Sequence, residues 1–271
     1  MTRHRLDSLL AERGLAGSRT SAAASVRAGR VRIGRDGPLA VKPGQLVAAE
    51  TELVVSEPPA YVSRGGTKLA NALAALSVET QGRDCLDVGA STGGFTDCLL
   101  KHGAARVIAL DVGHGQLDWG LRNDPRVEVM ERTNAREMRP TELSFVPTLA
   151  TIDVSFISLS LVLPAVVAGL AARADVLALV KPQFELGPDR VGKGGVVRSA
   201  DDRRDALASA ARAATAAGLV FKAFASSGLP GPKGNRESFM LCTTDGDAAD
   251  AEAAAREVEP PAEVNLGEVG S

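Results

Sequence analysis

The sequence is poor in aromatic, cysteine and histidine residues. Aromatic side chains make up 3% of 271 residues, with Tyr61 and Trp119 as the single representatives of their types. The three cysteines, Cys85, Cys98 and Cys242, lie far apart without a C-x-x-C spacing, and the three histidines are scattered too. Disulfide frameworks and metal sites depend on clustered ligands, so we expect neither a disulfide framework nor a bound metal.

Long apolar runs are also missing. The longest, "LVLPAVVAGLAA" at 161–172, is interrupted by Pro164 and Gly169 and falls short of the roughly 20 apolar residues that cross a bilayer. The N-terminal "MTRHRLDSLL" lacks the apolar core and small-residue cleavage site of a secretory signal. We therefore expect a cytoplasmic protein without a membrane partner.

The net charge of −2 conceals an uneven distribution. Residues 1–49 carry nine Lys and Arg against three acids, whereas residues 243–271 carry eight acids against one Arg. A basic segment of this kind usually holds an anionic partner.

The chain divides into four parts by pattern. Residues 1–57 predict a small α+β module with two helices, the second capped by Ser18, and strands at 30–34 and 52–56. Residues 58–66, "PPAYVSRGG", form an interdomain linker because the two prolines interrupt regular structure. Residues 244–271 are acidic and lack aromatics, so we expect a disordered tail.

Residues 67–243 predict a Rossmann-like α/β domain with a mostly parallel sheet. The strand-like runs "CLDV", "RVIAL", "VEVM", "TLATIDV" and "VLALV" alternate with helical stretches at 94–102, 115–122, 158–170 and 201–217. Nearly continuous apolar strands indicate a sheet covered on both faces. The last two runs, "LVFKAF" and "SFMLC", have no room between them for a crossover helix, so the last strand should be antiparallel.

The segment "CLDVGASTGGF" predicts a strand, a glycine turn and a helix start. Bare Gly89 and Gly93 would let a ligand approach the backbone, and Asp111, at the end of the next strand, could accept ribose hydroxyls. Dinucleotide dehydrogenases and adenosylmethionine-dependent methyltransferases share this arrangement. The G-x-G-x-x-G spacing of the dehydrogenases is absent, and Asp87 provides a strand-end acid, so the pattern favours S-adenosylmethionine.

Four charged residues are predicted near the carboxyl ends of the strands, where such sheets bind ligands: Lys68, Asp153, Lys181 and Glu237. A partly buried lysine can take a proton from an alcohol, and the two acids would fix the two ammonium groups. Taken singly, a lysine on a helix such as Lys68 or a glutamate near a turn such as Glu237 is more often a solvated surface residue.

The acceptor of the methyl group can be narrowed by what the sequence contains. Amino-group methylation of bases usually uses an Asn/Asp-Pro-Pro-aromatic segment, and the matching residues Asp153–Phe156 lack prolines. Carbon methylation uses a cysteine nucleophile, but Cys85 and Cys98 flank the glycine turn and Cys242 ends a strand. An oxygen acceptor, a ribose hydroxyl, fits a lysine base best.

Eight ordered segments resemble a known family: "RGGTKL", "LDVGASTGGFTD", "LDVGHGQLDWGLRNDPRV", "ERTNAR", "DVSFISL", "LVKPQFE", "GGVV" and "LPGPKGNRESF". Together they are similar to the hemolysin-A (TlyA) family of ribosomal RNA methyltransferases, over about residues 3–242. The resemblance implies transfer of methyl from S-adenosylmethionine to cytidine 2′-hydroxyls in RNA of the small and often also the large ribosomal subunit.

The resemblance also implies roles for particular residues. The family's catalytic tetrad falls on Lys68, Asp153, Lys181 and Glu237. The residues expected to bind the cofactor are Asp87, Gly89, Ala90, Ser91, Thr92, Gly93, Gly94, Asp111, Asn134 and Phe156. The N-terminal module is similar to an RNA-binding domain of a small-subunit ribosomal protein and of pseudouridine synthases. Expected RNA contacts are Arg3, Arg5, Arg19 and Lys42, together with Arg190 and Lys193 from the loop "PQFELGPDRVGKGGVV".

Two functions of other classes compete with the enzyme. The "hemolysin" name implies membrane lysis, although nothing in the chain resembles a pore-forming segment. A non-catalytic RNA-binding factor in ribosome assembly would use the same N-terminal module. Charged residues at all four tetrad positions favour the enzyme.

Overall fold

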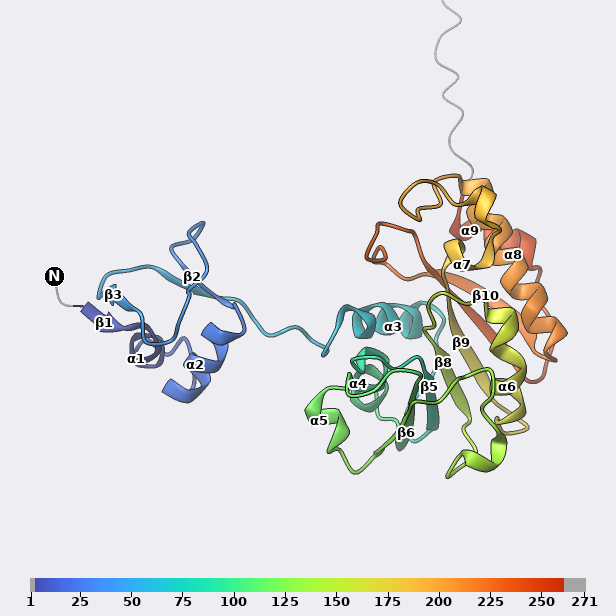
Figure 1. Ribbon diagram of the computed structural model, residues 1–271, viewed down its shortest axis with the longest axis horizontal. Coiled ribbons are helices and arrows are strands. Elements are labelled where there is room, and N and C mark those ends of the chain that lie inside the picture. Colours follow the sequence, from blue (N-terminus) through green and yellow to red (C-terminus); the bar gives the residue numbers. More distant parts are fainter. Residues whose placement is uncertain (1–2, 261–271) are drawn as a thin grey trace, which may run out of the picture. The chain divides into compact units, whose positions relative to one another are not determined.

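The computed structural model describes residues 3–260 of the chain (Figure 1). Contacts divide these residues into two compact units, one ending at Pro59 and one beginning at Ala60. Each unit is built around its own hydrophobic core.

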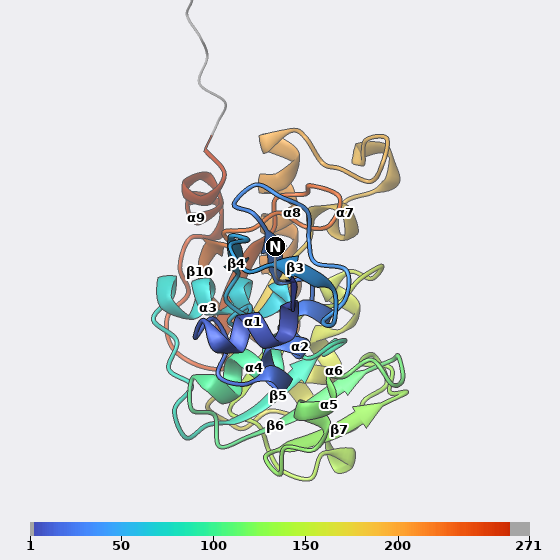
Figure 2. The ribbon, with the colours of Figure 1, turned by 90° about the vertical axis from the view of Figure 1, so that its left-hand side faces the viewer.

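The N-terminal unit packs two helices with two small antiparallel sheets. The helices, α1 (Leu6–Glu12) and α2 (Arg19–Arg27), contact each other (Figure 2). The strands are β1 (Arg3–Arg5) paired with β3 (Leu46–Ala48), and β2 (Val31–Ile33) paired with β4 (Leu53–Val55). Ser18 caps α2 as predicted, accepting a hydrogen bond from the Ser21 backbone N–H. Strands β1 and β3 were not predicted; β1 (RHR) contains no apolar residue that would indicate a strand.

The second unit contains a seven-stranded sheet in the order β10-β11-β9-β8-β5-β6-β7. The strands are β5 (Asp84–Val88), β6 (Arg106–Asp111), β7 (Val127–Glu131), β8 (Leu149–Ile152), β9 (Asp175–Val180), β10 (Val220–Ser226) and β11 (Ser238–Thr243). Strands β5 to β9 are parallel, and β11 is antiparallel to both of its neighbours, β9 and β10. The predicted Rossmann-like sheet with an antiparallel last strand is confirmed.

Helices accompany the strands, in chain order α3 (Arg64–Ala75), α4 (Gly94–Lys101), α5 (Trp119–Arg122), α6 (Leu163–Ala168), α7 (Pro182–Glu185), α8 (Ala200–Ala216) and α9 (Ala251–Val258). Short 3₁₀ turns occupy Pro140–Glu142, Leu159–Leu161 and Pro188–Arg190. Successive residues of β8 join different cores: Leu149 packs with residues of α3 and α4, and Ala150 packs with residues of α6 and α8. The strands read as continuous apolar runs because both faces of the sheet are covered.

Two predicted helix ranges are too long. The expected helix at 115–122 is confined to α5, because the Asp118 side chain accepts hydrogen bonds from the backbone N–H groups of Gly120 and Leu121 and starts the helix there. The stretch 158–170 divides into a 3₁₀ turn and α6, whose first turn contains Pro164.

The linker is shorter than predicted because α3 begins at Arg64, so the last three residues of 58–66 are helical. One of the glycines there, Gly66, lies at a close contact between helices. A Cβ on Gly66 would lie 2.8 Å from the Gly94 carbonyl oxygen and 2.3 Å from the Tyr61 Cβ. Gly66 therefore allows α3 to pack closely against the start of α4.

The acidic tail is ordered over its described part, so the prediction of disorder is wrong for residues 244–260. Helix α9 starts at the N-cap Asp250, and Ala251, Ala254, Ala255 and Val258 pack on the core that includes α8. These four positions recur with helical spacing. The acidic composition concealed this apolar stripe. Residues 261–271 lie outside the described part of the chain.

Candidate active site

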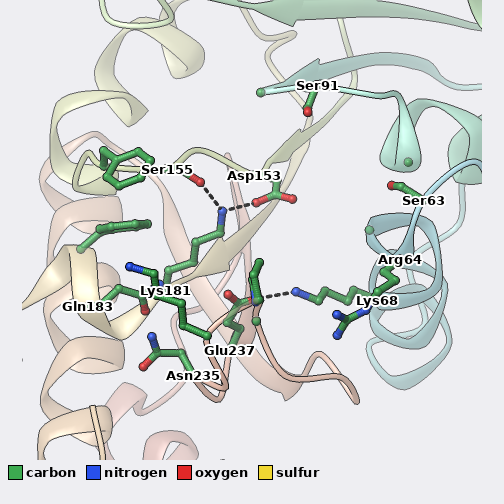
Figure 3. Close-up of a pocket in the computed structure, with 18 of the residues that line it drawn as sticks. Ser63, Arg64, Lys68, Ser91, Asp153, Ser155, Lys181, Gln183, Asn235 and Glu237 are labelled. Carbon is green, nitrogen blue, oxygen red and sulfur yellow. Dashed lines mark hydrogen bonds and ion pairs between the residues drawn. The ribbon is translucent and has the colours of Figure 1, made fainter. Parts of the chain in front are cut away.

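A pocket of about 780 Å³ opens at the carboxyl ends of β5, β8 and β9 (Figure 3). Its lining comes from the first turns of α3, the glycine turn after β5, the residues after β8 and β9, and the loop before β11. The strand order places β8 beside both β5 and β9, so their ends meet at one edge. All four residues of the predicted tetrad line this pocket.

Lys68 and Glu237 form a buried ion pair. Lys68 lies on α3 and Glu237 directly precedes β11, yet their Nζ and Oε2 atoms are 2.5 Å apart. Their side chains are 9% and 1% exposed, respectively. The interpretation of these two residues as solvated surface charges is therefore wrong. Each charge removes the large penalty that the other would incur if buried alone.

Lys181 and Asp153 form a second ion pair in the same pocket. Lys181 Nζ lies 2.6 Å from Asp153 Oδ1 and donates a hydrogen bond of 2.9 Å to Ser155 Oγ, as the dashed lines in Figure 3 show. The Asp153 backbone N–H donates to the Val88 carbonyl, which fixes the end of β8 against β5. Ser155 was not predicted, although its place two residues after Asp153 was a usable signal.

The glycine turn lines the pocket, and packing within the protein requires two of its glycines. A Cβ on Gly89 would lie 2.4 Å from the Asp153 carbonyl oxygen, and one on Gly93 would lie 2.3 Å from Leu121 Cδ1. Both glycines have a positive φ. Glycine is therefore needed at both positions for the fold of the turn itself. Gly89, Ala90, Ser91, Thr92 and Gly94 lie in the lining, whereas Gly93 does not.

The two acids near this turn shape it from outside the pocket lining. Asp87 is fully buried, and its carboxylate accepts hydrogen bonds from Thr96 Oγ1 (2.6 Å) and Thr151 Oγ1 (3.2 Å). Burial raises the pKa of Asp87 to about 7. Asp111 accepts from the backbone N–H groups of Ser91 (2.7 Å) and Gly113 (2.6 Å). Both acids were expected to bind the cofactor, and in the structure their hydrogen bonds support the turn.

The other two expected cofactor residues differ in position. Asn134 lies outside the lining. Its side chain forms hydrogen bonds within its own turn: Oδ1 accepts from the Arg136 backbone N–H, and Nδ2 donates to Glu137 Oε1. Phe156 lines the pocket mouth, is 89% exposed, and has its ring centroid 5.2 Å from that of Phe184. Its φ of 63° is strained for a bulky residue, and such strain concentrates at functional sites. Phe184 was not predicted.

The residues expected to contact RNA are distributed over both units. Lys193 is exposed, and Arg190 is paired with Asp202 and Asp205 on α8 while its side chain stays 40% exposed. Arg3 and Lys42 are exposed in the N-terminal unit.

Arg5 and Arg19 share one buried carboxylate in that unit. Asp7 Oδ2 lies 2.8 Å from Arg5 Nη2 and 3.3 Å from Arg19 Nε, while both arginines remain about half exposed. The hydrogen bond from Arg5 is the largest of the effects that lower the pKa of Asp7 to about 2. Two cations against one anion leave a net positive site on this surface.

The cysteines offer no nucleophile to the pocket. All three are buried outside its lining, and burial raises the pKa of each thiol to about 12. Among residues 3–260, no group of three His, Cys, Asp or Glu is placed to hold a metal ion.

A Rossmann-like sheet with an antiparallel last strand, and a glycine-lined pocket holding paired lysines and acids, define a methyltransferase. Residues 61–244 match the FtsJ-like methyltransferase family, and the chain belongs to that family.

Relatives of known name extend this comparison. The chain is 50% identical over 249 residues to the 16S/23S rRNA (cytidine-2'-O)-methyltransferase TlyA of Mycobacterium tuberculosis, covering 91% of this chain and 92% of the relative. It is 40% identical over 195 residues to Hemolysin A of Brachyspira hyodysenteriae, covering 72% and 80%. A solved structure of a candidate hemolysin from Streptococcus thermophilus is 40% identical with a TM-score of 0.73, covering 95% of this chain and 94% of that one.

Proposed function

We propose that the protein transfers the methyl group of S-adenosylmethionine to the 2′-hydroxyl of cytidines in ribosomal RNA. The observation that carries the proposal is the convergence of two lysine–carboxylate pairs, Lys68 with Glu237 and Lys181 with Asp153, in one pocket. The similarity to a relative that is named as an rRNA (cytidine-2'-O)-methyltransferase supports the choice of acceptor.

The glycine-turn side of the pocket fits S-adenosylmethionine. The volume of about 780 Å³ lies within the range of small-molecule sites. Gly89, Ala90, Ser91 and Thr92 present backbone and small side chains there, so a nucleoside can approach closely. When bound, the cofactor would supply a methyl group on a positively charged sulfonium. In each of the two ion pairs a carboxylate offsets the charge of the lysine beside it.

Lys181 is the proposed base. In its neutral form, Nζ takes the proton of the 2′-hydroxyl while the oxygen–methyl bond forms and the methyl–sulfur bond breaks. The ammonium so produced is stabilised by Asp153 at 2.6 Å and by Ser155 Oγ at 2.9 Å. Lys68, fixed by Glu237, donates a hydrogen bond to the reacting oxygen. General-base catalysis of this kind is worth roughly 10²–10⁴-fold in rate.

The mouth of the pocket suits an extruded nucleotide. A ribose inside a stacked helix would not reach Lys181, so the target must leave its stack. Phe156 and Phe184 offer an exposed aromatic surface on which the freed base can stack. Arg64 and Lys233 line the same pocket and provide positive charge for the flanking phosphates. The partners would be ribosomal subunits in the cytoplasm, bound in part by the N-terminal unit.

The test is transfer of labelled methyl from S-adenosylmethionine to isolated 30S and 50S subunits, followed by mapping of the blocked 2′-hydroxyls. We expect label on a cytidine ribose from the wild-type protein, and a loss of about 10²-fold or more with Lys181→Ala. Lys222→Ala is the matched control, because Lys222 lies outside the pocket lining and donates a hydrogen bond to the Asp247 carbonyl oxygen. This variant should keep full activity. Near-normal transfer by folded, cofactor-binding Lys181→Ala would refute the assignment.

Membrane lysis is the alternative suggested by the relative named Hemolysin A. In the part of the chain that the structure describes, no helix has the length and apolarity to cross a bilayer. Leakage from liposomes that persists with Lys181→Ala, without methyl transfer by the wild-type protein, would favour lysis. A protein that methylates neither subunit but promotes their assembly would instead be the non-catalytic factor.

A further inference from the structure

A buried carboxylate at the end of the C-terminal helix joins two arginines. Glu259 lies just after α9, beyond residue 244 where the family match ends, and is 3% exposed. Its Oε2 atom is 2.8 Å from Arg203 Nη2, and its Oε1 atom is 3.7 Å from Arg236 Nε. Arg203 is buried on α8, and Arg236 directly precedes Glu237 of the active site.

Arg203 connects Glu259 to a loop of the active site. Its Nη1 atom donates to the carbonyl oxygens of Arg198 (2.7 Å) and Val197 (3.4 Å). These carbonyls end the stretch 187–198, which places Val191 and Gly195 in the pocket lining. Glu259 thus orients the guanidinium that fixes one end of this loop.

A second anchor holds the same loop from the pocket side. Asn235 is 2% exposed and lines the pocket. Its Nδ2 donates to the Gly195 carbonyl (2.6 Å), and its Oδ1 accepts from the Val197 backbone N–H (2.9 Å). Val197 is therefore held by Asn235 on one side and by Arg203 on the other.

Stability alone is a weak reason for the Arg203–Glu259 pair. Desolvation of two charges usually offsets their attraction, so apolar residues of similar size serve a core at least as well. Arg203 Nε and Glu259 Oε2 are buried without a hydrogen bond among the described residues, so the contact of 2.8 Å is an ion pair. The apolar stripe of α9 already attaches the helix to the core. What the pair adds is a fixed direction for the Arg203 hydrogen bonds.

We propose that Arg203 and Glu259 are positioning residues that hold loop 187–198 in the shape required by the RNA substrate. This proposal rests on the proposed function for its substrate. Cofactor binding is unaffected, because the glycine turn contacts neither residue. The C-terminal helix thereby becomes part of the machinery that shapes the RNA side of the pocket.

Two single substitutions in the full chain test the connection. Arg203→Lys keeps a buried cation beside Glu259 but loses the donors to the two carbonyls, and Glu259→Gln keeps the shape but removes the charge. Glu257→Gln, an exposed acid on the same helix, is the control. The readouts are the melting temperature, cofactor affinity, kcat and KM for subunit methylation, and the rate of trypsin cleavage after Arg190, Lys193 and Arg198.

For Arg203→Lys and Glu259→Gln we expect faster cleavage in the loop and a kcat/KM for RNA lower by about tenfold, with cofactor affinity within about twofold of wild type. Glu257→Gln should match wild type in every readout. Wild-type cleavage and wild-type kcat/KM in Arg203→Lys would overturn the proposal.

The double variant Arg203→Met with Glu259→Met separates positioning from stability. It removes both buried charges, so the melting temperature should stay near that of wild type, while the loop remains unanchored and methylation stays low. Recovery of full methylation in this variant would show that the pair is merely structural. If the wild-type protein methylates neither subunit, the proposed function fails, and the cleavage rates still decide whether the loop is anchored by this pair.

Discussion

At the scale of single residues, Asp87 shows how a buried carboxylate can support the turn that lines a pocket without lining the pocket itself. Asp87 lies beneath the glycine turn, and its two oxygens accept hydrogen bonds from Thr96 and Thr151 on opposite sides. Thr96 belongs to α4 and Thr151 to β8, so Asp87, which lies on β5, connects three elements of the fold. Its burial favours the neutral form, which raises the pKa to about 7.

The titration of the Asp87 carboxyl group should make the free energy of unfolding depend on pH. The folded pKa of about 7 lies above the unfolded value, so the folded state holds a proton that the unfolded state has lost between about pH 4 and pH 7. The contribution of Asp87 to stability is therefore present below pH 4 and is lost as pH rises to 7. Asp87→Asn cannot lose a proton, so relative to wild type it should gain roughly 2–4 kcal/mol between pH 4 and pH 8.

Denaturant unfolding of wild type and Asp87→Asn across this pH range measures the difference between their free energies of unfolding. The titration of other groups affects both proteins alike and cancels in that difference. A difference in unfolding free energy that does not vary with pH would mean that Asp87 is ionised throughout the range. Loss of the folded state in Asp87→Asn at every pH would instead show that the amide cannot satisfy both threonine hydroxyls.

At the scale of elements, the turn between β5 and α4 is where backbone geometry controls the pocket. Gly89→Ala places a methyl group 2.4 Å from the Asp153 carbonyl oxygen and forces alanine into a φ near +86°. The turn must move, and Asp153 is part of the Lys181 pair. We expect cofactor affinity to fall by about tenfold or more and methylation to fall further, since both depend on placement.

Gly82→Ala is the matched control for backbone strain. Its φ is +71°, but a Cβ there meets no atom within 4 Å. It should lower stability by about 1–2 kcal/mol, the cost of a left-handed conformation, without altering cofactor affinity. Titration calorimetry with S-adenosylmethionine measures both variants, and equal affinities for Gly89→Ala and wild type would contradict this account of the turn.

The elements also show which parts of the molecule were predictable from the sequence. Strands such as β5 and β9 are apolar on both faces, so their runs stand out, and the charged residues that follow β8 and β9 were found for that reason. The Lys68–Glu237 pair joins residues 169 positions apart; the charges at the expected strand ends and helix start suggested one site, and the motif match gave the same four residues. Helix α9 was missed because alanine at helical spacing is a weak hydrophobic signal.

The reasons for particular side chains were harder to predict than the elements. The glycines of the turn and Asp87 were assigned to a ligand from the sequence, and the structure adds their packing against Asp153, Leu121, Thr96 and Thr151, which the sequence did not indicate. These neighbours come from distant parts of the sequence. A residue pattern identifies the turn, but the packing partners depend on the tertiary fold.

At the scale of the whole molecule, the candidate active site and the main cluster of exposed cations belong to separate units. The residues that line the pocket belong to the unit that begins at Ala60, and the N-terminal unit carries the Arg5–Asp7–Arg19 cluster, whose two half-exposed cations share one buried anion. Asp7 has a pKa of about 2, so the cluster keeps its charge throughout the physiological range. Such a cluster attracts phosphate groups without reading sequence.

The double variant Arg5→Ala with Arg19→Ala should therefore weaken binding to ribosomal subunits and leave the chemistry intact. Log affinity falls as log salt concentration rises, and each lost phosphate contact makes this slope less steep by roughly 0.7–0.9. Two lost contacts therefore predict a slope that is less steep by about 1.5. KM for subunits should rise, most strongly at low salt, while kcat and cofactor affinity remain those of wild type. The same change at two other exposed arginines, Arg173 and Arg256 of the catalytic unit, tests whether charge alone is responsible. If that variant weakens binding to the same extent, attraction is spread over the whole surface, and the N-terminal cluster has no special role in recognising the ribosomal particle.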